Sequence, residues 1–290
     1  MNNYIITVHA GLCNTIKSMI SYYRINDNKN KNIIVYNNKN DYNSIALINN
    51  GILPGSLKNL FENVEEKKVI PKNSKIIRTW RIITFKNDNL NDNIYYSYRD
   101  KYSNKYGDID FMYTKIPNNI KESIINNLQK IIIKKDILDE VKIISSKFND
   151  KTISVQINPI RIYTALKNNP NFSSDEMENF MRKKNSFIYD IVNEMKKYDD
   201  SYNFYLSISY KPLIDIFFNE FTKERIIYIE HEQNREWYFD MIDLLLLSKN
   251  KIIIGTALST FCEVAWFYSG CKSEIKLIGN YNFIPKELYI

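Results

Sequence analysis

The stretch FDMIDLLLLSKNKIIIGTALSTFCEVAWFYSG, residues 239–270, decides the fold of this chain. Its first part repeats apolar residues at helical spacing, as at Met241, Leu244 and Leu245. The run KIIIG, residues 251–255, is short, β-branched and closed by a glycine, which is typical of a buried parallel strand. A tight turn follows, and a helical pattern resumes at Thr260. The stretch therefore predicts a helix, a strand, a turn and a second helix.

The turn at residues 256–259 carries small hydroxyl residues at the point where the strand leads into the helix. Thr260 and Glu263 have the spacing of a capping box, with Thr260 as the helix cap. Open α/β sheets bind ligands beyond the carboxyl ends of their strands, and helix N-termini offer N–H groups to phosphate. The turn therefore predicts a phosphate site. An ordinary strand-to-helix turn has the same pattern, and every parallel α/β domain contains several.

The chain beyond residue 150 repeats this alternation regularly. Strand and helix patterns follow one another at lengths that favour a parallel sheet with right-handed crossovers. The predicted strands are 152–157, 203–208, 225–229, 251–255 and 274–278, and the predicted helices are 174–197, 211–221, 235–248 and 260–268. Residues 150–290 are therefore predicted to form a Rossmann-like domain with a regular parallel sheet.

The start of the chain has a similar pattern. A strand at 4–8 runs into a turn with Gly11 and with Asn14 as the predicted helix cap, and a second strand follows the helix at 32–36. The helix has one apolar face, formed by Ile16, Met19, Ile20 and Tyr23. Residues 1–149 are predicted to form a second Rossmann-like domain, with a ligand cleft between the two.

The middle of the chain is less regular. We predict a short helix at 56–62, a strand at 75–85 and a surface excursion rich in Asn, Tyr and Asp at 88–110. Helical residues then run from 116 to 147. Their predicted buried stripe consists of Ile124, Leu128, Ile131 and Ile132.

Composition excludes several classes of protein. With 290 residues, 44% of them hydrophobic and 25% charged, the chain is expected to be globular and long enough for two domains. It has no run of membrane-spanning length and no signal-peptide pattern at its start, so we expect a soluble, cytoplasmic protein. Three cysteines without paired spacing (Cys13, Cys262, Cys271) and only two histidines argue against a metal site. The net charge of +7 fits an anionic ligand, and its scatter along the chain argues against a nucleic-acid partner.

Three stretches resemble the fucosyltransferase superfamily, which has the GT-B fold and includes α1,6-, nodulation and protein O-fucosyltransferases. AGLCNTIKSMISYYRI, residues 10–25, is similar to the family's glycine loop and the helix after it. TISVQINP, residues 152–159, lies at the strand where the family carries His-x-Arg-Arg. Residues 239–270 are similar to the family's Asp-Leu-Leu-x-Leu-Ser and Gly-Ser/Thr-x-x-Ser-x-Phe. The matching residues there are Asp243, Leu244, Leu247, Ser248, Gly255, Thr256, Ser259 and Phe261.

The resemblance implies two Rossmann-like domains that face a cleft, with the acceptor at residues 1–149 and the nucleotide sugar at residues 150–290. It implies inverting, metal-independent transfer of a sugar from a nucleotide diphosphate sugar to a glycan or protein hydroxyl, with no cofactor. The implied catalytic residues are Asn14, Asn158 and Arg161. The implied donor-binding residues are Gly11, Leu12, Cys13, Gln156, Tyr210, Lys211, Asp243, Gly255, Thr256, Ser259 and Thr260.

Asp243 falls at the family position whose carboxylate contacts guanine, a base edge that offers two N–H donors. A solvated carboxylate on a helix would fit the same sequence pattern. GDP-fucose is the donor that the family implies. A UDP- or dTDP-sugar stays possible, because a glutamine at Gln156 can pair with the imide edge of uracil or thymine.

The sequence departs from the family at its main cation. The family His-x-Arg is here Gln156-Ile157-Asn158, which removes a positive charge from the diphosphate site. Arg161 and Lys211 are candidate replacements. The change motivates a second hypothesis, a catalytically inactive protein that binds nucleotide sugar or glycan.

The glycine loop also departs from the family, because Thr15 and Lys17 replace two of its arginines. No general base is assigned by the sequence. The carboxylates considered are Asp100, Asp108, Asp110, Glu230 and Glu232, and His231 is more typical of a loop histidine. A third hypothesis, a basic nucleic-acid-binding protein, lacks any RNA-binding signature.

Overall fold

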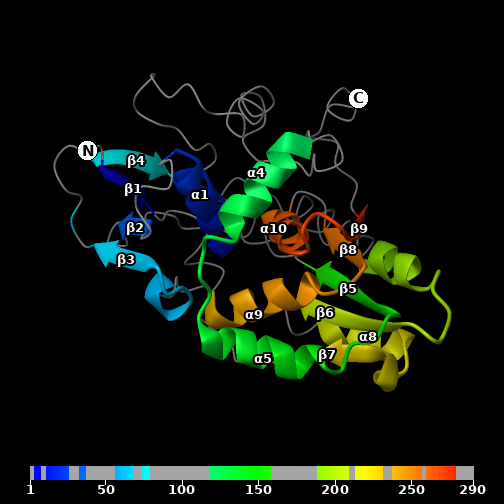
Figure 1. The fold of residues 1–290 in the computed structure, drawn as a ribbon. Helices are drawn as coiled ribbons and strands as arrows, with labels where there is room; N and C mark the ends of the chain where they lie inside the picture. Colours follow the sequence, from blue (N-terminus) through cyan, green and yellow to red (C-terminus); the bar gives the residue numbers. More distant parts are fainter. Residues whose placement is uncertain are drawn as a thin grey trace, which may run out of the picture.

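The chain folds into two parallel β-sheets with helices packed around them (Figure 1). The computed structural model describes residues 3–7, 11–25, 33–36, 56–67, 69, 74–78, 118–157, 188–208, 213–230, 237–256 and 259–278. One sheet is built from the start of the chain and the other from its second half. The predicted α/β class is therefore confirmed.

The N-terminal sheet has four strands in the order β3-β2-β1-β4, all paired in parallel. Its strands are β1 (Asn3–Thr7), β2 (Ile33–Tyr36), β3 (Val64–Lys67) and β4 (Ser74–Arg78). β1 and β2 lie within one residue of their predicted ranges, and β4 begins one residue before its predicted start. β3 was not predicted, because three of the four residues in its sequence VEEK are charged. Among the described strands, β3 pairs along one edge only.

The C-terminal sheet has five parallel strands in the order β7-β6-β5-β8-β9. Its strands are β5 (Thr152–Ile157), β6 (Asn203–Ile208), β7 (Ile226–Tyr228), β8 (Ile252–Thr256) and β9 (Glu274–Ile278). All five were predicted, with bounds that agree to within two residues. Every residue of β5 is buried, as expected for a central strand covered on both faces.

Helices cover both faces of this C-terminal sheet. On one face, Ile153, Val155 and Leu206 pack with the helical residues 188–195 and with α8. On the other face, Tyr205 and Ile253 pack with α9 and α10. The described helices are α1 (Leu12–Ile25), α4 (Asn118–Leu128), α5 (Lys135–Ser145), α8 (Ile214–Glu220), α9 (Trp237–Leu247) and α10 (Thr260–Tyr268), with short 3-10 helices η2 (Leu57–Asn59) and η4 (Lys223–Arg225).

The predicted helical segment 116–147 contains two helices, α4 and α5, because the residues between them pair with another part of the chain. The Glu62 N–H donates to the Ile132 carbonyl over 2.8 Å, and the Lys134 N–H donates to the Leu60 carbonyl over 3.0 Å. Ile132 is consequently 48% exposed, so its place in the predicted buried stripe is wrong. The other three members of that stripe are buried: Ile124, Leu128 and Ile131.

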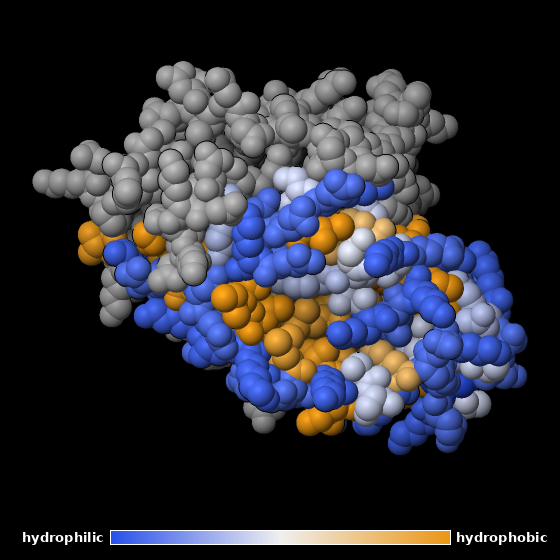
Figure 2. All heavy atoms as spheres, in the orientation of Figure 1, coloured by the Kyte–Doolittle hydropathy of each residue, from blue (hydrophilic) through white to orange (hydrophobic). Residues whose placement is uncertain are grey.

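One hydrophobic cluster joins the two sheets. It contains Ile6 and Val35 of the N-terminal sheet, Ile253 of the C-terminal sheet, and buried residues of α1, α4, α5, α9 and α10. The helix α5 packs on α9, where the Tyr238 hydroxyl donates to the Glu140 carboxylate over 3.0 Å. Figure 2 shows apolar side chains gathered over α9 on this face of the molecule. The predicted domain boundary near residue 149 stays a prediction, and α5, which precedes it, packs on a helix that follows it.

Candidate functional site

Three residues form a row across the C-terminal sheet, close to the carboxyl ends of its strands. Gln156 of β5 is the register partner of Ser207 on β6 and of Gly255 on β8. Gly255 faces Cys262 of α10, and Ser207 contacts Asp243 of α9. The row therefore lies under α9 at Ser207 and under the N-terminal part of α10 at Gln156 and Gly255, where the sequence predicts a ligand.

The side chain of Gln156 holds the end of β8 and the start of α10 together. Its Oε1 atom accepts a hydrogen bond from the Thr256 backbone N–H over 3.2 Å and from the Cys262 thiol over 3.3 Å. The Thr256 hydroxyl in turn donates to the Gln156 carbonyl over 3.2 Å. Gln156 is 4% exposed, so it acts as a buried brace beneath the predicted phosphate turn.

The turn between β8 and α10 has the predicted position but a different cap. The Ser259 N–H donates to the Thr256 carbonyl over 3.2 Å, which closes the turn. The helix begins at Thr260, so Ser259 occupies the N-cap position, and its side chain makes no capping hydrogen bond. The predicted capping box of Thr260 and Glu263 is therefore wrong, since the Glu263 carboxylate bonds to Lys17.

Asp243 lies on α9 with its carboxylate turned toward the sheet. It accepts hydrogen bonds from the Tyr205 hydroxyl over 2.6 Å and from the Ser207 hydroxyl over 3.0 Å. At 1% exposure, it is not the solvated helix carboxylate that was one reading of the sequence. A contact between Asp243 and a nucleobase stays a prediction, and it would require the buried carboxylate to become accessible to the base.

The second candidate turn precedes α1. The Gly11 carbonyl accepts hydrogen bonds from the Thr15 backbone N–H over 3.1 Å and from its hydroxyl over 3.3 Å. The helix begins at Leu12, so the prediction that Asn14 caps it is wrong: Asn14 lies within the first turn, half-buried. A Cβ atom added at Gly11 would meet no described atom within 4 Å.

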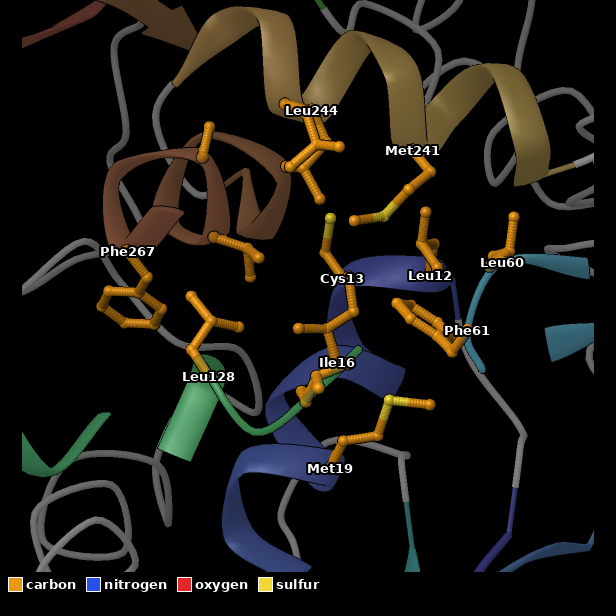
Figure 3. Packing of buried hydrophobic residues seen from close by; sticks show 14 of the residues in the cluster. Leu12, Cys13, Ile16, Met19, Leu60, Phe61, Leu128, Met241, Leu244 and Phe267 are labelled. Atoms are coloured by element: carbon orange, nitrogen blue, oxygen red, sulfur yellow. The ribbon is translucent and has the colours of Figure 1, made fainter. Parts of the chain in front are cut away.

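Two residues expected at the donor, Leu12 and Cys13, have buried side chains in the shared core. Figure 3 shows the Cys13 side chain directed between Met241 and Leu244 of α9. Burial raises the pKa of the Cys13 thiol well above its usual value, and the nearby Asp240 carboxylate raises it further. Any contact of these two residues with a ligand would therefore go through their backbone N–H groups.

An ion pair that the sequence did not predict connects α1 and α10, the helices that follow the two candidate turns. The Lys17 ammonium of α1 donates to the Glu263 carboxylate of α10, and the two side chains are 1% and 5% exposed. The Cys13 thiol lies close enough for Lys17 and Glu263 to act on its pKa in opposite directions. The N-terminal parts of α1 and α10 are thus packed side by side. A lone carboxylate within the apolar helix sequence TFCEVAWFY is the signal that could have indicated this pair.

Several predicted residues lie outside the described part of the chain. They are Asn158, Arg161, Tyr210 and Lys211 of the site, and the considered bases Asp100, Asp108, Asp110, His231 and Glu232. Glu230 is described and exposed. Within the described ranges, no group of three or more His, Cys, Asp or Glu side chains could hold a metal ion. None of the described helices is long and apolar enough to cross a membrane.

A scan against protein-family models finds no match, and a search of curated proteins finds none. Among solved structures, the chain is similar to the NodZ α-1,6-fucosyltransferase soaked with GDP-fucose, with 11% identity, a TM-score of 0.49 and coverage of 92% of this chain and 93% of that chain. It is similar to POFUT1 in complex with GDP, with 13% identity, a TM-score of 0.46 and coverage of 96% and 99%. A mutant of FUT1 from Arabidopsis thaliana in complex with GDP matches with 12% identity, a TM-score of 0.47 and coverage of 99% and 73%. These likenesses come at low identity, so conclusions about activity rest on the residues of the site.

Proposed function

We propose that the protein is a glycosyltransferase that moves a sugar from a nucleotide diphosphate sugar to a hydroxyl group of a glycan or protein. One observation carries the proposal: two strand-to-helix turns, one from each sheet, are brought together by direct packing of α1 on α10. Each turn follows the carboxyl end of a parallel strand, which is where α/β sheets bind ligands. A donor and an acceptor could therefore each contact one turn.

The diphosphate is proposed to bind at the N-terminus of α10. The first N–H groups of a helix have no partner within the helix, and the helix dipole favours negative charge there. The Ser259 side chain makes no capping bond to these N–H groups, so a phosphate would not have to displace it. Gln156 supports the arrangement from below by fixing Thr256 and Cys262.

Arg161 or Lys211 is proposed to supply the positive charge that stabilises the negatively charged diphosphate as it leaves. Lys17 is already paired with Glu263 in the core, and Asn158 carries no charge. Transfer is proposed to be inverting, as the family resemblance implies. It is also proposed to be independent of a metal ion, because helix N-termini and basic side chains can stabilise the developing charge. Gly11 and Asn14 would then line the cleft from the N-terminal half of the chain, with the Gly11 backbone close to the donor sugar.

The nucleobase of the donor is guanine or a pyrimidine, and binding of GDP, UDP and dTDP distinguishes them. The amide oxygen of Gln156 is already bonded to Thr256, so its NH2 group is the part that could contact a base. Guanine, uracil and thymine all offer a carbonyl oxygen to such a donor. GDP-fucose remains the donor that the motif positions favour.

The experiment is a thermal-shift series against GDP, UDP, dTDP and their sugars, followed by transfer and hydrolysis assays with the nucleotide that stabilises the protein most. We expect one nucleotide diphosphate to raise the melting temperature and activity to persist in chelator. No stabilisation by any of them would reject the proposal. Activity abolished by chelator and restored by Mn²⁺ would reject metal-independent transfer.

A second candidate function is a catalytically inactive protein that binds nucleotide sugar or glycan. It is favoured by the burial of Lys17 in an ion pair and by the neutral Gln156-Ile157-Asn158. Nucleotide binding without any sugar transfer or hydrolysis would support it over the first.

A further inference from the structure

The ion pair between Lys17 and Glu263 stands out because both charges are taken out of water in the shared core. The two side chains are 1% and 5% exposed, and the residues are 246 positions apart in the chain. Their neighbours in the core include Ile16 and Val264, both fully buried. A pair of this kind is weak evidence for stability, since apolar residues of similar volume often stabilise a core as well or better.

What such a pair does supply is a restraint on the relative orientation of the two helices. Apolar side chains on two helices tolerate small slides and rotations, whereas an ammonium and a carboxylate in a low-dielectric core must stay in contact. Lys17 lies in the second turn of α1 and Glu263 in the first turn of α10. The contact therefore restrains how the N-termini of the two helices face each other.

A chain of short contacts connects this pair to both candidate turns. Glu263 follows Cys262, whose thiol bonds to Gln156 and whose Sγ atom lies against Gly255. Lys17 is one helical turn beyond Cys13, in a helix whose first residues follow Gly11. A displacement of α10 relative to α1 would therefore change the separation of the two turns.

We propose that Lys17 and Glu263 are positioning residues whose ion pair fixes the separation and orientation of the Gly11 turn and the turn at residues 256–259. The effect on sugar transfer rests on the proposed function. The effect on the relative placement of the two sheets does not, and it can be measured on the protein without any ligand.

The test compares Lys17→Met and Glu263→Leu with the double variant that carries both. Each single change removes one member of the pair and leaves the other charge in the core without it, and we expect a fall in melting temperature on the order of 5–15 °C. The double variant should recover most of this loss, because neither charge of the pair remains in the core. Lys17→Arg, which keeps the charge, should keep the wild-type geometry. The control is Lys135→Met with Asp139→Asn, which removes an exposed ion pair on α5.

Distances between the two sheets are then measured with spin labels at Lys58→Cys and Lys223→Cys, which are exposed positions of η2 and η4. The background carries Cys271→Ser, because the other two cysteines are buried. We expect one narrow distance distribution in the wild type and in the control, and a shifted or broadened one in the stable double variant. An unchanged distribution in a double variant of restored stability would overturn the proposal.

Activity supplies the second readout. In the double variant we expect kcat to fall by about tenfold or more, because a small misplacement of reacting groups is costly. The affinity for nucleotide diphosphate should change less than about threefold, since the diphosphate contacts one turn only. A wild type that binds no nucleotide would reject the proposed function, while the label distances would still decide whether the pair positions the two sheets.

Discussion

The Sγ atom of Cys262 lies so close to Gly255 that a Cβ atom on residue 255 would stand 2.2 Å from it and 3.3 Å from the Cys262 Cβ atom. Glycine is needed there for close approach, because the first turn of α10 lies directly on the end of β8. The same approach brings the Cys262 thiol to within 3.3 Å of the Gln156 amide oxygen. The tight contact therefore sets the height of α10 above the row of site residues.

Gly255→Ala is expected to destabilise the protein by about 1–3 kcal/mol, the range for overpacking a well-packed core. Urea denaturation of the variant checks this. A second substitution, Cys262→Ala, removes the Sγ atom and should restore part of the loss. If Gly255→Ala costs the same with and without Cys262, the steric explanation fails.

Gly11→Ala is expected to leave stability nearly unchanged, within about 0.5 kcal/mol, because no described atom lies within 4 Å of the added Cβ. If the backbone of this turn approaches the donor sugar, the same methyl group should weaken nucleotide-sugar binding by about tenfold. Calorimetric titration beside thermal denaturation checks both values. Unchanged binding would remove Gly11 from the site.

Ser259→Ala should also cost little stability, since the Ser259 side chain makes no capping bond. If the turn holds the diphosphate, binding of a nucleotide diphosphate should weaken by about tenfold, the scale of one hydrogen bond to a charged group. Binding of the nucleoside should stay the same. Equal losses for nucleoside and diphosphate would place the phosphate elsewhere.

Asp243→Asn is expected to destabilise the protein by about 1.5–3 kcal/mol even without ligand, because the Tyr205 and Ser207 hydroxyls donate to its buried carboxylate. In a background that carries Ser207→Ala, Asp243→Asn should cost less stability, and a double-mutant cycle measures the coupling between the two residues. If the carboxylate also contacts guanine, the variant should lose affinity for GDP and keep its affinity for pyrophosphate. A loss of stability without a loss of GDP affinity would assign Asp243 a structural role only.

Alkaline pH is expected to unfold the protein. Burial raises the pKa of the Cys271 thiol from 9.0 to about 12, and it raises the pKa of the buried Cys13 and Cys262 thiols as well. Well below pH 9.0 these thiols are protonated in both the folded and the unfolded state, so they do not change the free energy of unfolding with pH. Above it the unfolded chain releases protons that the folded chain keeps, so the free energy of unfolding falls up to about pH 12.

Urea midpoints measured between about pH 7 and pH 10.5 check this alkaline decline, because stability changes with pH wherever the two states bind different numbers of protons. Cys13→Ala removes one of the buried thiols and should make the decline shallower. A midpoint that stays constant above pH 9.0 would contradict the shifted pKa values of the thiols.

The strands of the C-terminal sheet were predictable because burial on both faces leaves a plain sequence signal. Ile252–Thr256, with the sequence IIIGT, is buried at every position but its first and forms one strand, as its apolar run indicates. The strand Val64–Lys67 left no such signal, since an edge position accepts charged residues. The break between α4 and α5 was not predictable either, because it depends on pairing with residues 60–62.

The candidate site shows the same division between local and distant signals. The turn at 256–259 was predictable from its position between a strand and a helix. The spacing of Thr260 and Glu263 favoured a capping box, which Glu263 does not form because Lys17 binds it. The hydroxyls that bond to Asp243 come from β6, which is distant in the sequence, so the periodicity of α9 does not indicate them.

The single core that connects the two sheets has a consequence for how the protein can be divided. A fragment cut at the predicted boundary, residues 150–290, would lose α1, α4 and α5. The surfaces of α9 and α10 that these helices cover include Met241, Leu244 and Phe267, and all three would be left in water. Exposed apolar patches of this kind promote aggregation. The C-terminal half is therefore expected to be insoluble when expressed alone, and folding should require both halves, supplied as one chain or co-expressed as two.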